Sequence, residues 1–87
     1  MIKQRIGQRI KEIRTSELKI TQAELAKKLG WDRTFLSRIE SGKQNITIEN
    51  LYSLCIAMNV SLKDFFSTFD NENSKNEISK NGGNINE

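Results

Sequence analysis

The sequence predicts an all-α fold of five helices, and three observations lead to that prediction. Its 87 residues include no proline and only 7% aromatic residues, which suits helices joined by short turns better than a sheet. Apolar residues recur at intervals of three and four along most of the chain. Between residues 21 and 42, small Ala26, Gly30 and the apolar Leu36 and Ile39 have the spacing of two short helices that cross over a tight turn.

The first helix is expected from Ile2 to about Thr15. Its apolar stripe has spacings of four, four and three, with lysines and arginines on the outer face; it consists of Ile2, Ile6, Ile10 and Ile13. Gly7 costs this helix about 1 kcal/mol relative to alanine, so close packing against a neighbour is one reason for a glycine there. Residues 15–20 are expected to form a connection whose Leu18 and Ile20 return to the core.

The second and third helices have local start and stop signals. Thr21 and Glu24 form the T-x-x-E pattern of a capping box, in which each side chain accepts a hydrogen bond from the other's backbone N–H. Gly30 ends the second helix because glycine takes a positive φ without steric cost. Asp32 is the N-cap of the third helix.

The third helix has two different faces. Phe35, Leu36 and Ile39 cluster on the packing side at 100° per residue. The other side is polar and basic, and it presents Arg33, Thr34, Ser37 and Arg38.

Two further helices follow. Thr47 caps the fourth, which is expected from Ile48 to Met58 and mostly in the core. Its apolar positions are Ile48, Leu51, Leu54, Cys55 and Met58. Cys55 is read as a small buried hydrophobic residue rather than a nucleophile or redox sensor. Ser61 with Asp64 opens a short fifth helix from Leu62 to about Ser67.

Charge divides the chain in two. Residues 1–69 contain 12 Lys and Arg against 7 Asp and Glu, whereas residues 70–87 contain 2 against 4. A basic domain fits an anionic partner such as nucleic acid, although many small domains are mildly basic without one. Residues 70–87 hold six asparagines and two isolated isoleucines, so we expect a disordered polar tail, with a partner-binding segment as the alternative.

Composition also limits the compartment and the chemistry. One cysteine and no histidine exclude a disulfide within the chain and any His/Cys metal site of known spacing. The first residues lack the apolar run of a signal peptide, and no stretch is long enough to span a bilayer. We expect a cytoplasmic protein with no cofactor, no metal and no evident small-molecule ligand.

Seven positions carry a resemblance to a known family. They are Gln22, Ala26, Gly30, Leu36, Ile39, Glu40 and Gly42, and they match the lambda-repressor-like, Cro/C1-type (XRE) helix-turn-helix family. The resemblance covers residues 5–66 and implies a five-helix DNA-binding domain. Within the family, the segment from Asp32 to Thr47 is similar to the controller proteins of restriction–modification systems.

The resemblance and the residue chemistry together predict a DNA-contacting surface. Arg33 and Arg38 can reach guanine bidentately, or each can contact a phosphate instead. Thr34 and Ser37 can meet thymine methyl groups, bases or phosphate. The expected phosphate contacts are Thr21, Gln22, Trp31, Lys43, Gln44 and Asn45; the resemblance also has Gln22 brace the recognition helix, and Trp31 is alternatively a seal on the core.

The resemblance implies two further features. Arg14 lines up with a family arginine that pairs with the glutamate found here at Glu40, although the alignment needs one extra residue in the loop before Gln22. The alternative is that Arg14 and Glu40 are two exposed, unrelated charges. Apolar residues near the fifth helix are numerous for so small a bundle, which indicates either a two-fold dimer interface or closure of the core by Phe65 and Phe66. The candidate interface residues are Val60, Leu62, Phe65, Phe66 and Phe69.

The predicted function is therefore that of a homodimeric, sequence-specific regulator on a pseudo-palindromic operator in double-stranded DNA, acting on its own promoter as controllers do. Phage or plasmid repressors and antitoxins share the fold and stay open as alternatives, as does a protein-interaction module. An enzyme is the least supported class, because no nucleophile stands with a base at a known spacing.

Overall fold

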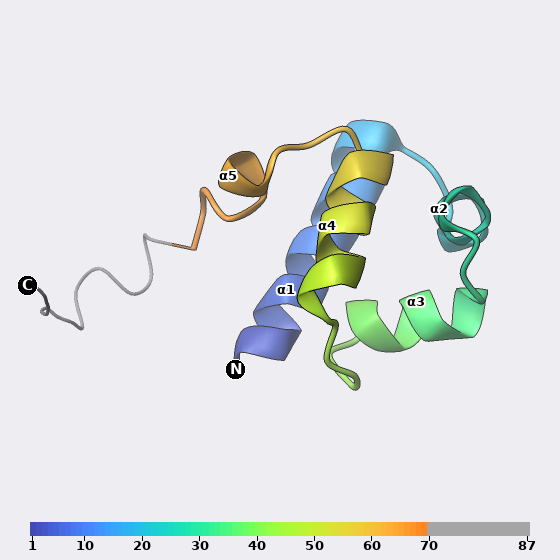
Figure 1. The fold of residues 1–87 in the computed structure, drawn as a ribbon, viewed down its shortest axis with the longest axis horizontal. Coiled ribbons are helices and arrows are strands. Elements are labelled where there is room, and N and C mark those ends of the chain that lie inside the picture. The colour runs from blue at the N-terminus through green and yellow to red at the C-terminus, as the bar shows by residue number, and fades with distance from the viewer. Residues whose placement is uncertain (70–87) are drawn as a thin grey trace, which may run out of the picture.

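The computed structural model describes residues 1–69, and all of their regular structure is helical. The elements are α1 (Ile2–Glu12), the π-helical segment η1 (Ile13–Leu18), α2 (Gln22–Leu29), α3 (Arg33–Glu40), α4 (Ile48–Ala57) and α5 (Leu62–Phe65). In Figure 1, α2 and α3 lie on one side of α4 and α5 lies on the other. The prediction of five helices is confirmed, whereas the predicted disordered tail lies outside the described residues.

The expected connection over residues 15–20 is wrong, because the chain stays helical through Leu18. The i→i+5 hydrogen bonds of η1 make a wider turn than those of an α-helix. Lys19 ends η1 in the left-handed conformation with φ at 56°. The segment turns the side chains of Ile13 and Arg14 inward, where both are buried.

Local capping signals act as the sequence predicts. Thr21 Oγ1 accepts from the Glu24 N–H at 3.0 Å, and Glu24 Oε1 accepts from the Thr21 N–H at 2.8 Å, which completes the capping box. Gly30 ends α2 with φ at 73°, and Asp32 caps α3 by accepting from the Thr34 N–H. These caps fix the turn between α2 and α3.

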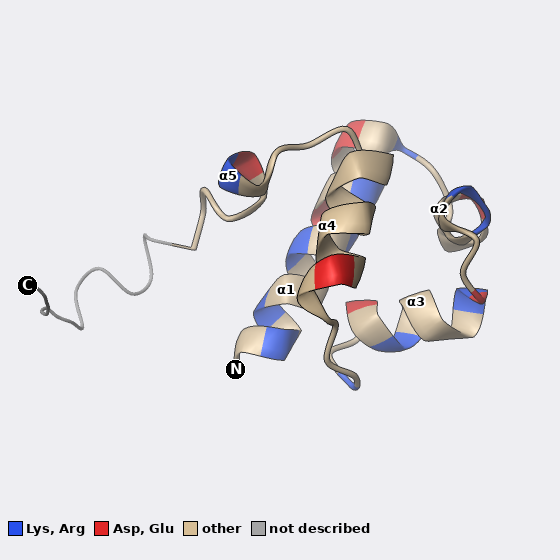
Figure 2. Cartoon of the chain, in the orientation of Figure 1, with Lys and Arg blue, Asp and Glu red and all other residues tan. Residues whose placement is uncertain are grey.

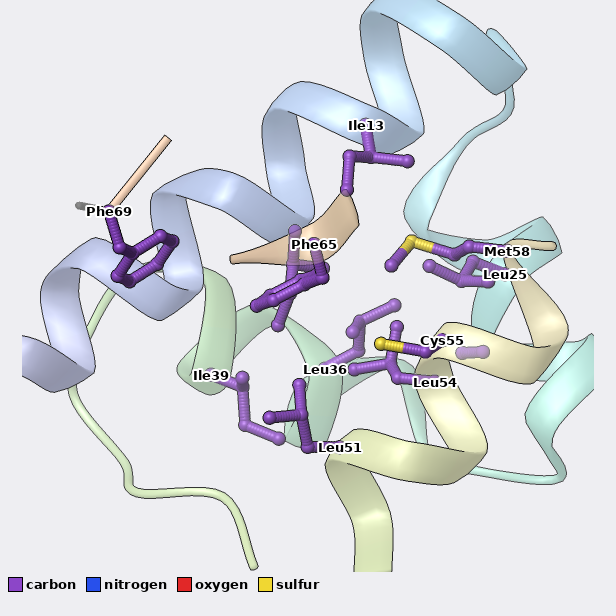
Figure 3. Close-up of a cluster of buried hydrophobic side chains, with 12 residues drawn as sticks. Ile13, Leu25, Leu36, Ile39, Leu51, Leu54, Cys55, Met58, Phe65 and Phe69 are labelled. Carbon is purple, nitrogen blue, oxygen red and sulfur yellow. The ribbon is translucent and has the colours of Figure 1, made fainter. Parts of the chain in front are cut away.

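The core joins all the helices around Phe65, which lies among side chains from the other helices in Figure 3. Its buried members are Ile10, Ile13, Leu25, Ala26, Leu36, Ile39, Leu51, Leu54, Cys55, Met58, Phe65 and Phe69. Cys55 is buried as predicted, and burial raises the pKa of its thiol. Phe69 lies to one side against α1 in Figure 3.

Two positions expected in the apolar stripes are instead on the surface. Ile2 is 60% exposed and Ile48 is 79% exposed. Each is the first residue of its helix, and helical side chains point back toward the N-terminus, so both extend beyond the core. Tyr52 and Ile56 are also more than half exposed. The outer face of α4 is therefore an apolar stripe at every fourth residue, and α4 is less buried than predicted.

Two arginines of α1 hold the C-terminal segment against the bundle. Arg9 donates from Nε to the Phe65 carbonyl and from a terminal nitrogen to the Asp64 carbonyl, both at 2.8 Å. Arg5 lies over the ring of Phe69 at 4.4 Å from its centroid. In the single chain Phe65 is 0% and Phe69 is 8% exposed, so both lie in the core, and a dimer contact by either residue stays a prediction.

Candidate nucleic-acid interface

The outer face of α3 is formed by the four side chains predicted to read bases. Arg33, Thr34 and Arg38 are exposed, and Ser37 is half-buried. The opposite face buries Leu36 and Ile39. The packing of α3 thus leaves its polar and basic side free for a partner.

Because Gly7 has no side chain, the backbone of α1 comes into contact with the backbone at the C-terminal end of α3. A Cβ added at Gly7 would meet the carbonyl oxygen of Ile39 and lie 2.7 Å from that of Glu40. Such distances are far shorter than van der Waals contact, so only glycine fits here. The close approach fixes how far α3 stands from α1.

A chain of polar contacts links Arg14 of η1 through Glu40 of α3 and Gln22 to Arg33 on the outer face of α3. Arg14 donates from Nε and a terminal nitrogen to the two carboxylate oxygens of Glu40, at 2.7 and 2.9 Å, and from the other terminal nitrogen to the Ile20 carbonyl. Both partners of this pair are 7% exposed. The structure therefore brings Arg14 and Glu40 together, and the alternative of two unrelated surface charges is wrong.

Gln22 extends this network to the surface. Its Nε2 donates to Glu40 Oε1 at 2.9 Å, and its Oε1 accepts from a terminal nitrogen of Arg33 at 3.4 Å. An amide nitrogen carries two N–H groups, so one remains available for a phosphate oxygen. The position of Gln22 suits both roles that the resemblance implies.

Beside Gln22 is a polar notch, which we define by its lining residues Lys11, Gln22, Ser37, Glu40 and Ser41. Sequence reasoning missed Lys11 as part of this surface, because α1 was read as a packing helix. The only signal was a lysine on the polar face of α1. Its exposed side chain belongs to the same surface as the outer face of α3.

The loop after α3 brings the remaining predicted phosphate contacts to the end of the helix. Lys43 and Asn45 are exposed, whereas Gln44 is half-buried and accepts from Arg38 Nε at 3.0 Å. Sequence reasoning missed this contact and assigned Gln44 to phosphate alone. A side chain six residues beyond Arg38 gives no periodic signal, since its position depends on the loop.

Trp31 packs in the turn between α2 and α3. Its ring is half-buried against the core and meets Phe35 edge to face, with ring centroids 5.1 Å apart. The structure thus gives it the sealing role, and the predicted phosphate contact stays a prediction.

The charges of this surface are mostly basic. Figure 2 shows Lys and Arg on α1, on α3 and in the loop after α3.

Over residues 1–69, no helix is long and apolar enough to cross a membrane. In the same residues no group of three or more acidic, histidine or cysteine side chains could hold a metal ion.

Two helices crossing over a capped turn, with a basic outer face on the second, define the helix-turn-helix class of DNA-binding proteins. A family model described as "Helix-turn-helix" matches residues 10–65. The chain therefore belongs to the helix-turn-helix family, and the resemblance to its Cro/C1-type members is confirmed.

Similar proteins include controllers of restriction–modification systems. Control protein C.MunI from Mycoplasma sp. is 32% identical over 71 residues, which cover 82% of this chain and 96% of that protein. Control protein C.BamHI from Bacillus amyloliquefaciens is 34% identical over 67 residues, covering 75% and 83%. The crystal structure of a Tyr-to-Phe variant of the restriction–modification controller protein C.Esp1396I matches with a TM-score of 0.76 and 35% identity, covering 88% of this chain and 96% of that chain.

Proposed function

We propose that this protein is a sequence-specific transcriptional regulator of a restriction–modification system, which binds a pseudo-palindromic operator as a homodimer. One observation carries the proposal: α3 is anchored by Gly7 and the Arg14–Glu40 pair while its outer face stays polar and basic. An adaptor of the same fold would present an apolar face there. The similarity to control proteins is the reason for proposing that the regulated genes are those of a restriction–modification system.

Recognition would divide between the phosphate backbone and the bases. The phosphate contacts would come from Thr21 and Gln22 at the start of α2, from Lys11, which lines the polar notch with Gln22, and from Lys43 and Asn45 after α3. Arg33 and Arg38 would contact guanine O6 and N7 in the major groove. A protein built this way acts by occupancy of its site, without catalysis.

The homodimer is proposed through the outer face of α4 and the start of α5. Ile48, Tyr52 and Ile56 recur at every fourth residue and are 79%, 55% and 63% exposed; Leu62, the first residue of α5, is 42% exposed. A second copy in two-fold symmetry would cover the same stripe on both chains. Of the predicted interface residues, Leu62 and the half-buried Val60 and Phe66 can still contribute.

Fluorescence anisotropy tests the proposed function directly. The protein is titrated onto a duplex from upstream of its own gene and onto a scrambled duplex, at two salt concentrations. We expect tight binding to the native duplex alone, with two chains or a multiple per site. Equal, weak and steeply salt-dependent binding to both duplexes would overturn the proposal, because it would reduce the basic surface to a nonspecific phosphate contact.

A further inference from the structure

Arg38 on the outer face of α3 is held by a side chain that lies outside that helix. Its Nε donates to Gln44 Oε1 at 3.0 Å. We propose that Gln44 is a positioning residue that orients the Arg38 guanidinium toward a base and thereby sets specificity at one base pair. This inference rests on the proposed function, since it concerns how that DNA-reading face selects its sequence.

The backbone of the loop is fixed before Gln44 is reached. Gly42 has φ at +78°, and a Cβ there would lie 2.6 Å from Cγ of Gln4 on α1. The Lys43 N–H and the Ser41 hydroxyl both donate to the Arg38 carbonyl, at 3.0 and 3.1 Å. The loop is therefore turned back over the end of α3, with its bonds directed at Arg38 itself.

The side chain of Gln44 is also partly enclosed. It lines a mostly apolar groove of about 160 Å³ together with Ile2, Lys3, Ile6, Ile39, Asn45 and Ile46. Gln44 is half-buried, whereas its neighbours Lys43 and Asn45 are exposed. Its amide oxygen is the group that accepts from Arg38.

This arrangement leaves Arg38 the atoms that base reading needs. No group in residues 1–69 has a hydrogen bond with its two terminal nitrogens, which can together meet guanine O6 and N7. A side chain ordered before binding loses less conformational freedom on binding. The Gln44 contact therefore favours one guanidinium orientation without occupying the terminal N–H groups.

The test separates this role from a phosphate contact by Gln44. Gln44→Met keeps the length and the apolar stem but removes the oxygen that accepts from Arg38. Anisotropy is measured on the native duplex and on duplexes with each base pair of one half-site exchanged. Arg38→Ala first identifies the base pair at which discrimination depends on Arg38.

We expect Gln44→Met to reduce discrimination at that base pair by about three- to tenfold, with unchanged binding to the scrambled duplex. In the Arg38→Ala background Gln44→Met should have no further effect, because the two residues act as a unit. Gln44→Glu, which keeps an accepting oxygen, should retain the discrimination ratio while its negative charge weakens binding to every duplex. Thermal unfolding of Gln44→Met should match that of the wild type.

Two results would overturn the inference. An equal loss on all duplexes, undiminished in the Arg38→Ala background, would make Gln44 a phosphate contact, which is the behaviour expected of the comparison variant Asn45→Ala. Wild-type protein that does not distinguish native from scrambled DNA would overturn the proposed function and this inference together. If only the role of Gln44 is wrong, the wild-type protein still distinguishes the native duplex from the scrambled one, and the proposed function stands.

Discussion

Glu40 shows how one residue connects the interior to the outer face of α3. Its carboxylate accepts from Arg14 twice and from Gln22 once, and Gln22 in turn contacts Arg33. A buried charge is costly unless it is paired and hydrogen-bonded, and here both oxygens are engaged. The pair is better understood as fixing the geometry of α3 than as adding net stability.

Removing one partner should therefore be much worse than removing both. Glu40→Ala leaves the Arg14 guanidinium buried without its carboxylate, and should lower the free energy of unfolding by about 3 kcal/mol in urea titrations. The double variant Arg14→Met/Glu40→Leu should regain most of that loss, yet bind the native duplex more weakly than the wild type. Equal stability of Glu40→Ala and the wild type would show that the pair is not effectively buried.

Cys55 gives a prediction about reactivity. Its thiol is 2% exposed and burial raises its pKa, so the thiolate fraction at pH 8 lies below that of an exposed cysteine. A disulfide reagent such as DTNB should react slowly with the native protein and rapidly after unfolding in urea. Fast reaction with the native protein would contradict the assignment of Cys55 to the core.

At the scale of elements, α1 and its continuation η1 position two other helices, α3 and α5. Gly7 admits the end of α3, Arg9 binds carbonyls at the end of α5, and the π-helical continuation turns Arg14 inward. A cation near the last carbonyls of a helix also opposes the negative end of its dipole. This continuous helical segment thus contacts both α3 and the C-terminal segment and sets their positions.

The glycine gives the sharpest test of this packing. Gly7→Ala should raise the helix propensity of α1 by about 1 kcal/mol. Its methyl group would nevertheless overlap the backbone carbonyls of α3, so we expect a net loss of about 1–3 kcal/mol in the free energy of unfolding. Gln8→Ala is the matched control, because position 8 is exposed on the same helix. A more stable Gly7→Ala variant would show that α1 and α3 can separate without cost.

At the scale of the whole molecule, the apolar outer face of α4 is exposed on a single chain and would be covered in the dimer that we propose. A single helix-turn-helix head reads one half-site, whereas a two-fold dimer reads two. The exposed stripe of Ile48, Tyr52 and Ile56 is the surface that a second copy would cover. Concentration would then control operator occupancy through dimerisation.

Placing a charge on this stripe should prevent that assembly. Ile56→Lys should shift the molar mass from two chains to one in size-exclusion chromatography with light scattering, and should weaken binding to the full operator. Ile2→Lys is the control, since Ile2 is 60% exposed against 63% for Ile56 but lies on α1. If both variants stay dimeric, the interface lies elsewhere.

The sequence by itself determined the helices, their caps and the two faces of α3. The capping box of Thr21 and Glu24, the turn at Gly30 and the cap at Asp32 depend on residues within a few positions of each other. The outer residues of α3 follow from its periodicity. The Arg14–Glu40 pair could be assigned in advance because the resemblance covers these helices, whereas the base contacts of α3 stay a prediction.

Only the tertiary structure decided which of the apolar and polar groups meet. Arg9 bonds the Phe65 carbonyl 56 residues away, and Phe65 lies fully buried in the core of the single chain. Gln44 reaches Arg38 because the loop turns back over the end of α3, and η1 replaces the expected connection. Such contacts depend on how elements pack, and neither hydrophobic periodicity nor local propensity encodes the distance between residues that are far apart in the chain.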